Sequence, residues 1–336
     1  MTTMGRRRVA PAVVTAVFVT LTTACGSAPQ ATAPGTEPGA AGFPVTVTSC
    51  GREVTFDAPP QRIVTTAVGL TDTVFQLGAG DRMVGVGSTA YQQPLPAFAA
   101  QVAAIPALGE TDTGKKEQVL ATAPQLVFAE DSTYPFDPSS GLATVDQLTQ
   151  AGAGVYISAN GCGGANGPVE NIYVDVQNLG RILGVQQAAD GLVGQLRARV
   201  DAAVASMRGT TARVAVLGAG EGDVGLYAIG PRYTQGHMLT TLGLENVFAD
   251  TPDDFVQVNP EAVIARNPEV IFIGTDGKPA TTESKLTFAR SVFAHTDAGR
   301  SGRIYPLDDA GGQPGSTRGV TQVEQIARDV LAPGAS

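Results

Sequence analysis

The sequence contains no tryptophan, two histidines and three cysteines among its 336 residues. So few histidines argue against a zinc or manganese site built from several imidazoles, and so few cysteines exclude a disulfide-rich miniprotein. Charged residues make up only 16% of the chain, and 31 acidic residues outnumber 22 basic ones. The formal charge of −9 argues against binding to nucleic acid, which needs a basic face to displace counterions from phosphates.

What the sequence does contain is enough apolar material for a folded protein. Hydrophobic residues make up 43% of the chain, which excludes disorder for most of its length. A chain of 336 residues has room for two domains of ordinary size.

The first 24 residues have the pattern of an export signal. Arg6–Arg8 form a positive cluster, and the thirteen residues Val9–Leu21 are mostly apolar. This run is shorter than the roughly 20 residues that cross a bilayer as a helix. Removal of residues 1–24 leaves 19 basic and 31 acidic residues, a formal charge of −12.

A cysteine and a flexible segment follow the predicted signal. Leu21–Cys25 resembles a bacterial lipoprotein signal, although its leucine stands four residues before the cysteine, where the family prefers three. Residues 25–44 are rich in Gly, Pro and Ala and are predicted to be a flexible tether. The resemblance implies a diacylglycerol thioether on Cys25, and so a lipid anchor as the sole membrane attachment, on the outer face of the cytoplasmic membrane. The alternative is an ordinary cleaved signal with Cys25 incidental.

The remaining two cysteines, Cys50 and Cys162, form an even pair in a chain that is predicted to be exported. Because the compartments outside the cytoplasm are oxidising, this pair predicts a disulfide. The alternative is two unrelated buried thiols.

An internal repeat is the most informative feature of the rest of the chain. Glu117–Ala129 and Glu261–Ile273 are identical at five of 13 positions and differ by an aliphatic exchange at three more. Each copy predicts a short helix that ends before Pro124 or Pro268, followed by a buried strand. Two further segments recur upstream in the same order.

The first of these, Arg62–Thr65 and Arg213–Val216, is predicted to be an opening strand. The second, Leu77–Asp81 and Leu242–Glu245, has the glycine that is typical of a helix C-terminus. The sequence therefore predicts two duplicated α/β lobes with mostly parallel sheets.

A long helix is predicted between the halves, because residues 169–207 contain no proline and carry apolar residues at helical spacing. We therefore predict an N-terminal lobe over residues 45–170, a connecting helix over 171–207 and a C-terminal lobe over 208–333. Facing lobes leave a ligand cleft where the carboxyl ends of their strands meet.

Three segments, Cys50–Val64, Leu77–Gly85 and Leu242–Asp250, together with the two repeats, resemble the substrate-binding proteins of iron-siderophore and cobalamin ABC importers. The resemblance covers about residues 45–332. It implies two three-layer α/β lobes joined by one long backbone helix, with a ligand cleft between them. It also implies a monomeric partner of an ABC permease that captures a ferric siderophore for iron uptake.

Two motifs that suggest nucleotide binding are incomplete. Gly109–Lys116 resembles a P-loop but lacks its final Ser or Thr. The glycines of Gly220–Gly225 fit the spacing of a dinucleotide site, but such a site needs a helix directly afterwards, and Val224–Ile229 is predicted to be a strand. The sequence also contains neither a GxSxG nor an HExxH motif. We therefore expect no enzymatic activity, no cofactor and no metal site.

Loops that follow strands supply the candidate ligand contacts. A ferric siderophore saturates its own metal, so the protein needs aromatic walls and charged or hydrogen-bonding groups rather than iron ligands. Arg232 and Arg318 would suit anionic catecholate or carboxylate oxygens, although either could be an ordinary surface arginine. The candidates are Tyr91, Glu130, Tyr134, Arg232, Tyr233, His237, Phe255 and Arg318.

Three alternatives remain open. Receptors for cobalamin line the cleft with aromatics, including Trp, whereas here only Phe255 fits and the positions near Thr111 and Glu130 are not aromatic. A haem receptor would use Tyr233 or His237 as an axial ligand, although His237 could simply be exposed at a helix start. The third alternative is a sensor lipoprotein of the same fold with no transport partner.

Glu117 and Glu261 begin equivalent predicted helices in the two halves. In the family that the chain resembles, a glutamate at this place on each lobe meets an arginine pocket of the permease. The resemblance therefore implies that both glutamates dock the permease. A favourable interaction with the helix dipole is the alternative for either one.

Overall fold

The computed structural model describes residues 42–90, 92–163, 167–219 and 225–333. The first lobe contains β1 (Val45–Ser49), β2 (Arg52–Phe56), β3 (Ile63–Thr65), α1 (Val68–Gln76), β4 (Met83–Val86), α2 (Ala99–Ala103), α3 (Lys116–Ala121), β5 (Leu126–Ala129), α4 (Val145–Gln150) and β6 (Gly154–Ile157). Helices α5 (Glu170–Leu183) and α6 (Gln186–Ser206) follow. The second lobe contains β7 (Arg213–Ala219), β8 (Leu226–Ile229), α7 (Thr234–Thr241), β9 (Glu245–Asn246), β10 (Phe255–Val258), α8 (Pro260–Arg266), β11 (Val270–Thr275), α9 (Pro279–Val292), α10 (Asp297–Arg300), β12 (Ile304–Asp308), α11 (Asp309–Gly312) and α12 (Arg318–Leu331).

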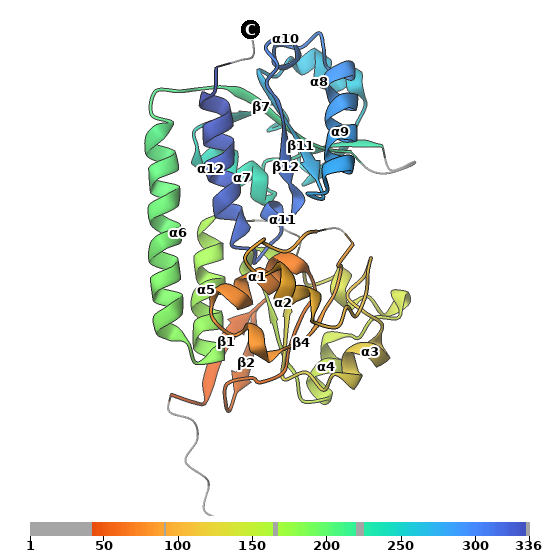
Figure 1. Cartoon of the computed structure of the whole chain (residues 1–336), viewed down its shortest axis with the longest axis vertical. Helices are drawn as coiled ribbons and strands as arrows, with labels where there is room; N and C mark the ends of the chain where they lie inside the picture. Colours follow the sequence, from red (N-terminus) through yellow and green to blue (C-terminus); the bar gives the residue numbers. More distant parts are fainter. Residues whose placement is uncertain (1–41, 91, 164–166, 220–224, 334–336) are drawn as a thin grey trace, which may run out of the picture. The chain divides into compact units, whose positions relative to one another are not determined.

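Each lobe is built on one main sheet (Figure 1), and the first lobe also contains the separate antiparallel hairpin β1-β2. The first sheet has the strand order β4-β3-β5-β6, and all its pairs are parallel. The second has the order β10-β8-β7-β11-β12, with β9 also beside β7. In it β8 and β10 are antiparallel to their neighbours and the other pairs are parallel. The predicted α/β fold with mostly parallel sheets is confirmed.

The second lobe has a strand where the sequence predicts a loop. The strand expected at Val224–Ile229 is present as β8. Part of the expected loop around Phe255 is instead the edge strand β10, in which exposed residues alternate with half-buried ones. One face of this edge strand is exposed and the other is only half-buried, so few of its positions need apolar residues. Its alternating pattern is therefore weak in the sequence.

The duplication extends to how the repeat helices end. The residue before the proline, Ala123 after α3 and Asn267 after α8, has a φ of +46° and +42° respectively. The side chain of Arg62 donates to the last two carbonyls before the first proline, and that of Arg213 does the same in the second copy. These two arginines, each at the start of a matching strand segment, therefore satisfy carbonyls that the helix leaves unpaired.

The segment predicted as a single connecting helix contains two. Helix α5 ends at Leu183, and Gly184 follows it with a φ of +70°. The left-handed conformation at Gly184 ends α5 without a proline. The absence of proline from residues 169–207 therefore does not by itself predict one continuous helix. Helix α6, with 21 residues, is the long helix, and it packs on α5 and on α12 (Figure 1).

Cys50 and Cys162 form the predicted disulfide, with 5.1 Å between their Cα atoms. Cys50 lies in the turn between β1 and β2, and Cys162 follows β6. The hydroxyl of Ser49 also donates to the carbonyl of Ile157 and accepts from its amide. The disulfide therefore ties the N-terminal hairpin to the first sheet.

The largest apolar cluster spans the two lobes. It contains Leu70 of α1, Phe128 of β5, Leu196 of α6, Val216 of β7 and Ile326 of α12, all at least 98% buried. Burial of such side chains is the main favourable term in folding. Within the described residues, every helix is too short or too polar to cross a membrane.

Candidate functional site

The first lobe places a carboxylate at the carboxyl edge of its sheet. Glu130 follows β5, and the hydroxyl of Thr66, which follows β3, donates a hydrogen bond to it. The backbone amide of Glu130 in turn donates to the hydroxyl oxygen of Thr66 over 3.3 Å. Burial raises the pKa of Glu130 to about 7.

The second lobe contributes three aromatic rings, which we call the aromatic cluster: Tyr227, Tyr233 and Phe255. The ring of Phe255 lies 4.5 Å from that of Tyr233 and 5.7 Å from that of Tyr227, measured between centroids. Phe255 is nevertheless 49% exposed. Separations of this size are those of interacting aromatic pairs, so the three rings form one surface that is open to a ligand.

Two glycines on neighbouring strands make room for this surface. Gly218 of β7 pairs with Gly274 of β11. A Cβ atom on Gly218 would lie 1.9 Å from the ring of Tyr227, and one on Gly274 would lie 2.4 Å from the carboxylate of Asp309. Any larger residue would therefore displace the phenol or the carboxylate.

Asp309 gives the aromatic cluster a negative neighbour. Burial raises its pKa to about 7, Asp308 and Asp276 act in the same direction, and Lys285 opposes them. Burial and the charge of Asp309 also raise the pKa of Tyr227 to about 12. Both phenols of the cluster are therefore neutral at physiological pH.

The carboxylates of both lobes lie within electrostatic reach of Tyr233. Burial raises the pKa of this phenol far above its usual value, and the charges of Asp309, Glu130 and Asp131 raise it further. Glu130 and Asp131 belong to the first lobe, and Tyr233 and Asp309 to the second. Glu130 of the first lobe is therefore within electrostatic range of Tyr233 of the second.

The remaining candidates have other surroundings. Tyr91 lies outside the described residues. Tyr134 is 53% exposed, and its hydroxyl donates to the carbonyl of Thr111 over 2.9 Å. Arg232 lies with its Nε 3.4 Å from the carboxylate of Asp254. His237 is half-buried in the first turn of α7.

Arg318 does not face an open cleft. It is 7% exposed at the start of α12 and forms ion pairs with Asp72 of α1, which is fully buried, and with Asp308 over 3.0 Å. Its guanidinium also donates to the carbonyl of Gln93. The anion-binding role that the sequence suggests for Arg318 is therefore disfavoured, because its donors are already occupied.

Arg318 belongs to a set of contacts that join the two lobes, which we call the interlobe network: Asp72, Thr73, Gln92, Gln313 and Arg318. Thr73 donates to the carbonyl of Gly315 over 3.0 Å, and Gln92 donates to Gln313 over 2.8 Å. Gln92 also accepts from the amide of Gly69. Polar groups that are buried and paired in this way hold their partners in one arrangement.

Sequence reasoning did not single out Tyr227 and Asp309, although both lie in loops that it expects to line the cleft, and it missed Asp72 and Thr66. A signal existed for the first two, because Gly218 and Gly274 near strand ends are typical of a close approach by another group. Asp72 and Thr66 gave none. A buried aspartate within a helix is visible only when its partner, 246 residues away, is known.

A cavity of about 600 Å³ lies in the first lobe, away from the aromatic cluster. It is lined mainly by apolar side chains between α1, β4 and α2, among them Val68, Val86 and Val102. Its size is within the usual range for ligand pockets. It shares no lining residue with the aromatic cluster and offers a ligand no charged group.

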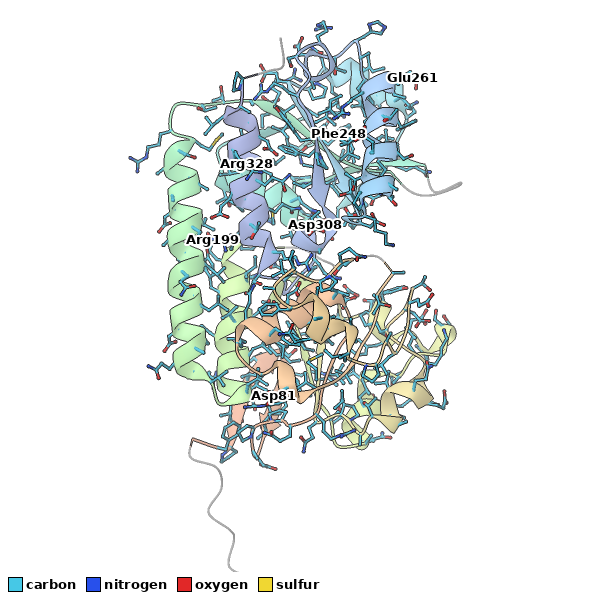
Figure 2. The ribbon with its side chains drawn as sticks, viewed as in Figure 1. Asp81, Arg199, Phe248, Glu261, Asp308 and Arg328 are labelled. Carbon is cyan, nitrogen blue, oxygen red and sulfur yellow. A yellow bond between two sulfur atoms is a disulfide. The ribbon has the colours of Figure 1, made fainter. Side chains whose placement is uncertain are left out.

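Glu117 and Glu261 occupy equivalent exposed positions in the first turns of α3 and α8, and Figure 2 shows Glu261 on α8. Other groups cap these turns. Gln118 accepts from the amide of Lys115, and Asn259 accepts from the amide of Ala262. Across the ranges that the structure describes, neither glutamate carboxylate accepts a hydrogen bond, and Glu117 lies 3.7 Å from the ammonium of Lys116.

No group of three or more His, Cys, Asp or Glu side chains among the described residues is arranged to hold a metal ion. The loops at the strand ends instead present aromatic rings, phenols and carboxylates.

Comparison with known proteins agrees with this geometry. A family model described as periplasmic binding protein matches residues 63–310. A cobalamin-binding protein of Halobacterium salinarum is 28% identical over 91% of this chain and 79% of its own length. An uncharacterised ABC transporter substrate-binding lipoprotein of Bacillus subtilis is 24% identical over 86% of both chains.

Solved structures give the same result for the fold. An ABC-type Fe³⁺-hydroxamate transport protein of Saccharomonospora viridis has 27% identity and a TM-score of 0.71, and the match covers 86% of this chain and all of that one. A periplasmic haem-binding protein of Roseiflexus, at 24% identity and a TM-score of 0.66, shares the fold over 80% of this chain and 97% of its own. The chain therefore belongs to the periplasmic binding protein family, the substrate-binding components of ABC importers.

Proposed function

We propose that this protein captures a ferric siderophore outside the cytoplasmic membrane and delivers it to the permease of an ABC importer. The aromatic cluster, with carboxylates from both lobes close to it, is the observation that carries this proposal. Such a surface suits a large ligand that brings its own coordinated metal. The similarity to an Fe³⁺-hydroxamate transport protein over that protein's whole length supports an iron cargo.

Binding is tested by titrating the full chain, exported with Cys25→Ala, with ferric siderophores and following tyrosine fluorescence. Because the chain has seven tyrosines and no tryptophan, the tyrosines report any quenching by the ligand. We expect at least one ferric siderophore to bind with a Kd of about 1 μM or tighter, within the range of specific binding. If no ferric siderophore binds, the proposal is wrong.

A glycine variant locates the site. Gly218→Ala places a methyl group where the ring of Tyr227 lies, and we expect it to weaken siderophore binding about tenfold or more, since a displaced wall removes contacts. Gly191→Ala on α6 is the matched control, because a Cβ atom there meets nothing within 4 Å. Equal affinity for both variants would mean that the ligand binds elsewhere.

Cobalamin is the second candidate, and one contact favours it. Thr111 marks a position where cobalamin receptors have an aromatic residue and this chain does not. The hydroxyl of Tyr134 donates to the carbonyl of Thr111, so the ring of Tyr134 lies beside that position. A relative, the Halobacterium protein, is named for cobalamin binding. Tight cobalamin binding in the same titration would replace the siderophore assignment. A Soret band that is lost in Tyr233→Phe or His237→Ala would instead assign haem.

Lipid anchoring is also part of the proposal, and Cys25 lies outside the described residues. We expect Cys25→Ala to move the protein from the membrane fraction to the soluble fraction, because one acylated residue would be its only attachment. The measurement is fractionation followed by immunoblotting, with Cys50→Ala/Cys162→Ala as the control that keeps the anchor. A Cys25→Ala protein that stays in the membrane fraction would contradict the anchor.

A further inference from the structure

The loop that follows β6, residues 158–163, lies against the segment that carries Glu130, and we call it the β6 loop. The amide of Ser132 donates to the carbonyl of Gly161 over 3.0 Å, and the hydroxyl of Ser132 accepts from the amide of Gly163 over 3.1 Å. A Cβ atom on Gly161 would lie 2.0 Å from the carbonyl oxygen of Glu130, so the two backbones are in direct contact. The position of the β6 loop therefore constrains the position of that segment.

Different anchors hold the two ends of the β6 loop. Its start is held from α5, where the fully buried carboxylate of Asp175 accepts from the amide of Ala159 over 2.8 Å. The side chain of Asn160 also accepts from a side chain of α5 over 2.6 Å. The far end carries Cys162, which the disulfide joins to Cys50. Removal of the disulfide therefore weakens the hold on the far end and leaves the start anchored.

The N-terminal hairpin has other attachments to the first lobe. The hydroxyl of Ser49 bonds to both backbone groups of Ile157 at the end of β6. The guanidinium of Arg181 on α5 donates to the carbonyl of Thr46 over 2.7 Å. Because these contacts keep the hairpin in place without the disulfide, the hairpin can serve as the fixed support and the β6 loop as the part that the disulfide holds.

We propose that the disulfide between Cys50 and Cys162 positions Glu130 and Asp131 beside the aromatic cluster, by holding the far end of the β6 loop against residues 130–132. A loop that is already in its bound conformation loses less freedom when a ligand binds, so the cross-link favours binding without contacting the ligand. The effect on affinity rests on the proposed function, whereas the effect on the loop does not.

Amide hydrogen exchange without ligand tests the effect on the loop, in the full chain with Cys25→Ala. In Cys50→Ser/Cys162→Ser we expect the amides of Ser132 and Gly163 to exchange about tenfold faster or more, because their hydrogen bonds open when the far end moves. The amide of Ala159 should change by less than about twofold, since Asp175 still accepts from it. The measurement is exchange detected by NMR.

Phe293→Leu is the matched control for a general loss of stability. Phe293 is fully buried in an apolar cluster of the second lobe, and loss of its ring destabilises that lobe. We expect the ratio between the exchange rates of Ser132 and Ala159 to stay at its wild-type value in this variant. An equal rise at both amides in the cysteine variant would show general loosening and would contradict a positioning role.

A ferric trihydroxamate is the probe for the effect on binding. We expect Cys50→Ser/Cys162→Ser to weaken its binding about tenfold, and Phe293→Leu to leave it within about twofold. Gly161→Ala is a second variant that keeps the disulfide but places a methyl group against the carbonyl of Glu130. It should weaken binding by a similar factor, and it decides the question if the cysteine variant does not fold.

The outcomes separate this inference from the proposed function. Faster exchange at Ser132 but not at Ala159, together with weaker binding in both site variants, supports the positioning role. If exchange at Ser132 is unchanged, or if both variants bind the probe as the wild type does, the positioning role is wrong and the ferric siderophore assignment stands. If the wild type binds no ferric siderophore, the proposed function is wrong, and the exchange at Ser132 alone decides whether the disulfide positions the loop.

Discussion

Arg318→Met is expected to lower the free energy of unfolding by about 3–5 kcal/mol, the usual loss when one partner of a buried ion pair is removed. The substitution leaves the carboxylate of Asp72 fully buried without its cation. It also removes a donor to the carbonyl of Gln93. The measurement is chemical denaturation of the full chain followed by circular dichroism.

Two further variants test the cause of this loss. In Arg318→Met/Asp72→Asn the buried charge is gone and an oxygen remains to accept from the amide of Leu95, so we expect more than half of the lost stability to return. Arg199→Met is the matched control. Arg199 pairs with Glu324 over 2.6 Å, but both side chains are more than one-third exposed, so the expected loss is at most about 1 kcal/mol.

The loss in Arg318→Met should depend on pH. Burial already raises the pKa of Asp72, and Arg318 is the main opposing influence. Without Arg318 the pKa of Asp72 rises further, so the folded state binds a proton that the unfolded state releases, and stability falls as pH rises. We expect a smaller loss at pH 5 than at pH 8. An equal loss at both values, or an equal loss in Arg199→Met, would contradict a role for the buried charge.

The sequence was sufficient for the parts of the fold that depend on local pattern. The repeat helices α3 and α8, the strands that follow them and the glycine caps of α1 and α7 were all predicted from spacing and from Pro or Gly positions. The disulfide followed from the number of cysteines. The break at Gly184 was missed because a single glycine is compatible with a continuous helix.

The candidate site was predictable only in part. Phe255 and Tyr233 follow strands or belong to strand ends, so the rule that loops after strands form the cleft found them. Arg318 follows the same rule but turns toward Asp72, because that aspartate, on a helix of the other lobe, offers a buried carboxylate. Such pairings depend on the tertiary structure, and nothing in a local pattern distinguishes a ligand-binding arginine from one that joins two lobes.

Glu117 and Glu261 raise the corresponding question for the permease. Their carboxylates are exposed, accept no hydrogen bond in the described part of the chain and stand in turns that Gln118 and Asn259 already cap. A capping role alone therefore accounts poorly for a glutamate in both copies. We propose that each carboxylate meets an arginine of the permease, since complementary charges position a partner and a pair is lost when one member is neutralised.

Glu117→Ala/Glu261→Ala is therefore expected to abolish most ligand uptake and most stimulation of the ATPase in a reconstituted importer. Ligand affinity should stay within about twofold, because neither residue belongs to the aromatic cluster. Stability should stay within about 2 kcal/mol, because each site loses at most a helix-dipole interaction. The matched control is Glu53→Ala/Glu245→Ala, which removes one exposed glutamate from a strand of each lobe, on β2 and β9. If uptake falls equally in both double variants, the effect is one of net charge. If it falls in neither, the helix dipole is the better account of Glu117 and Glu261.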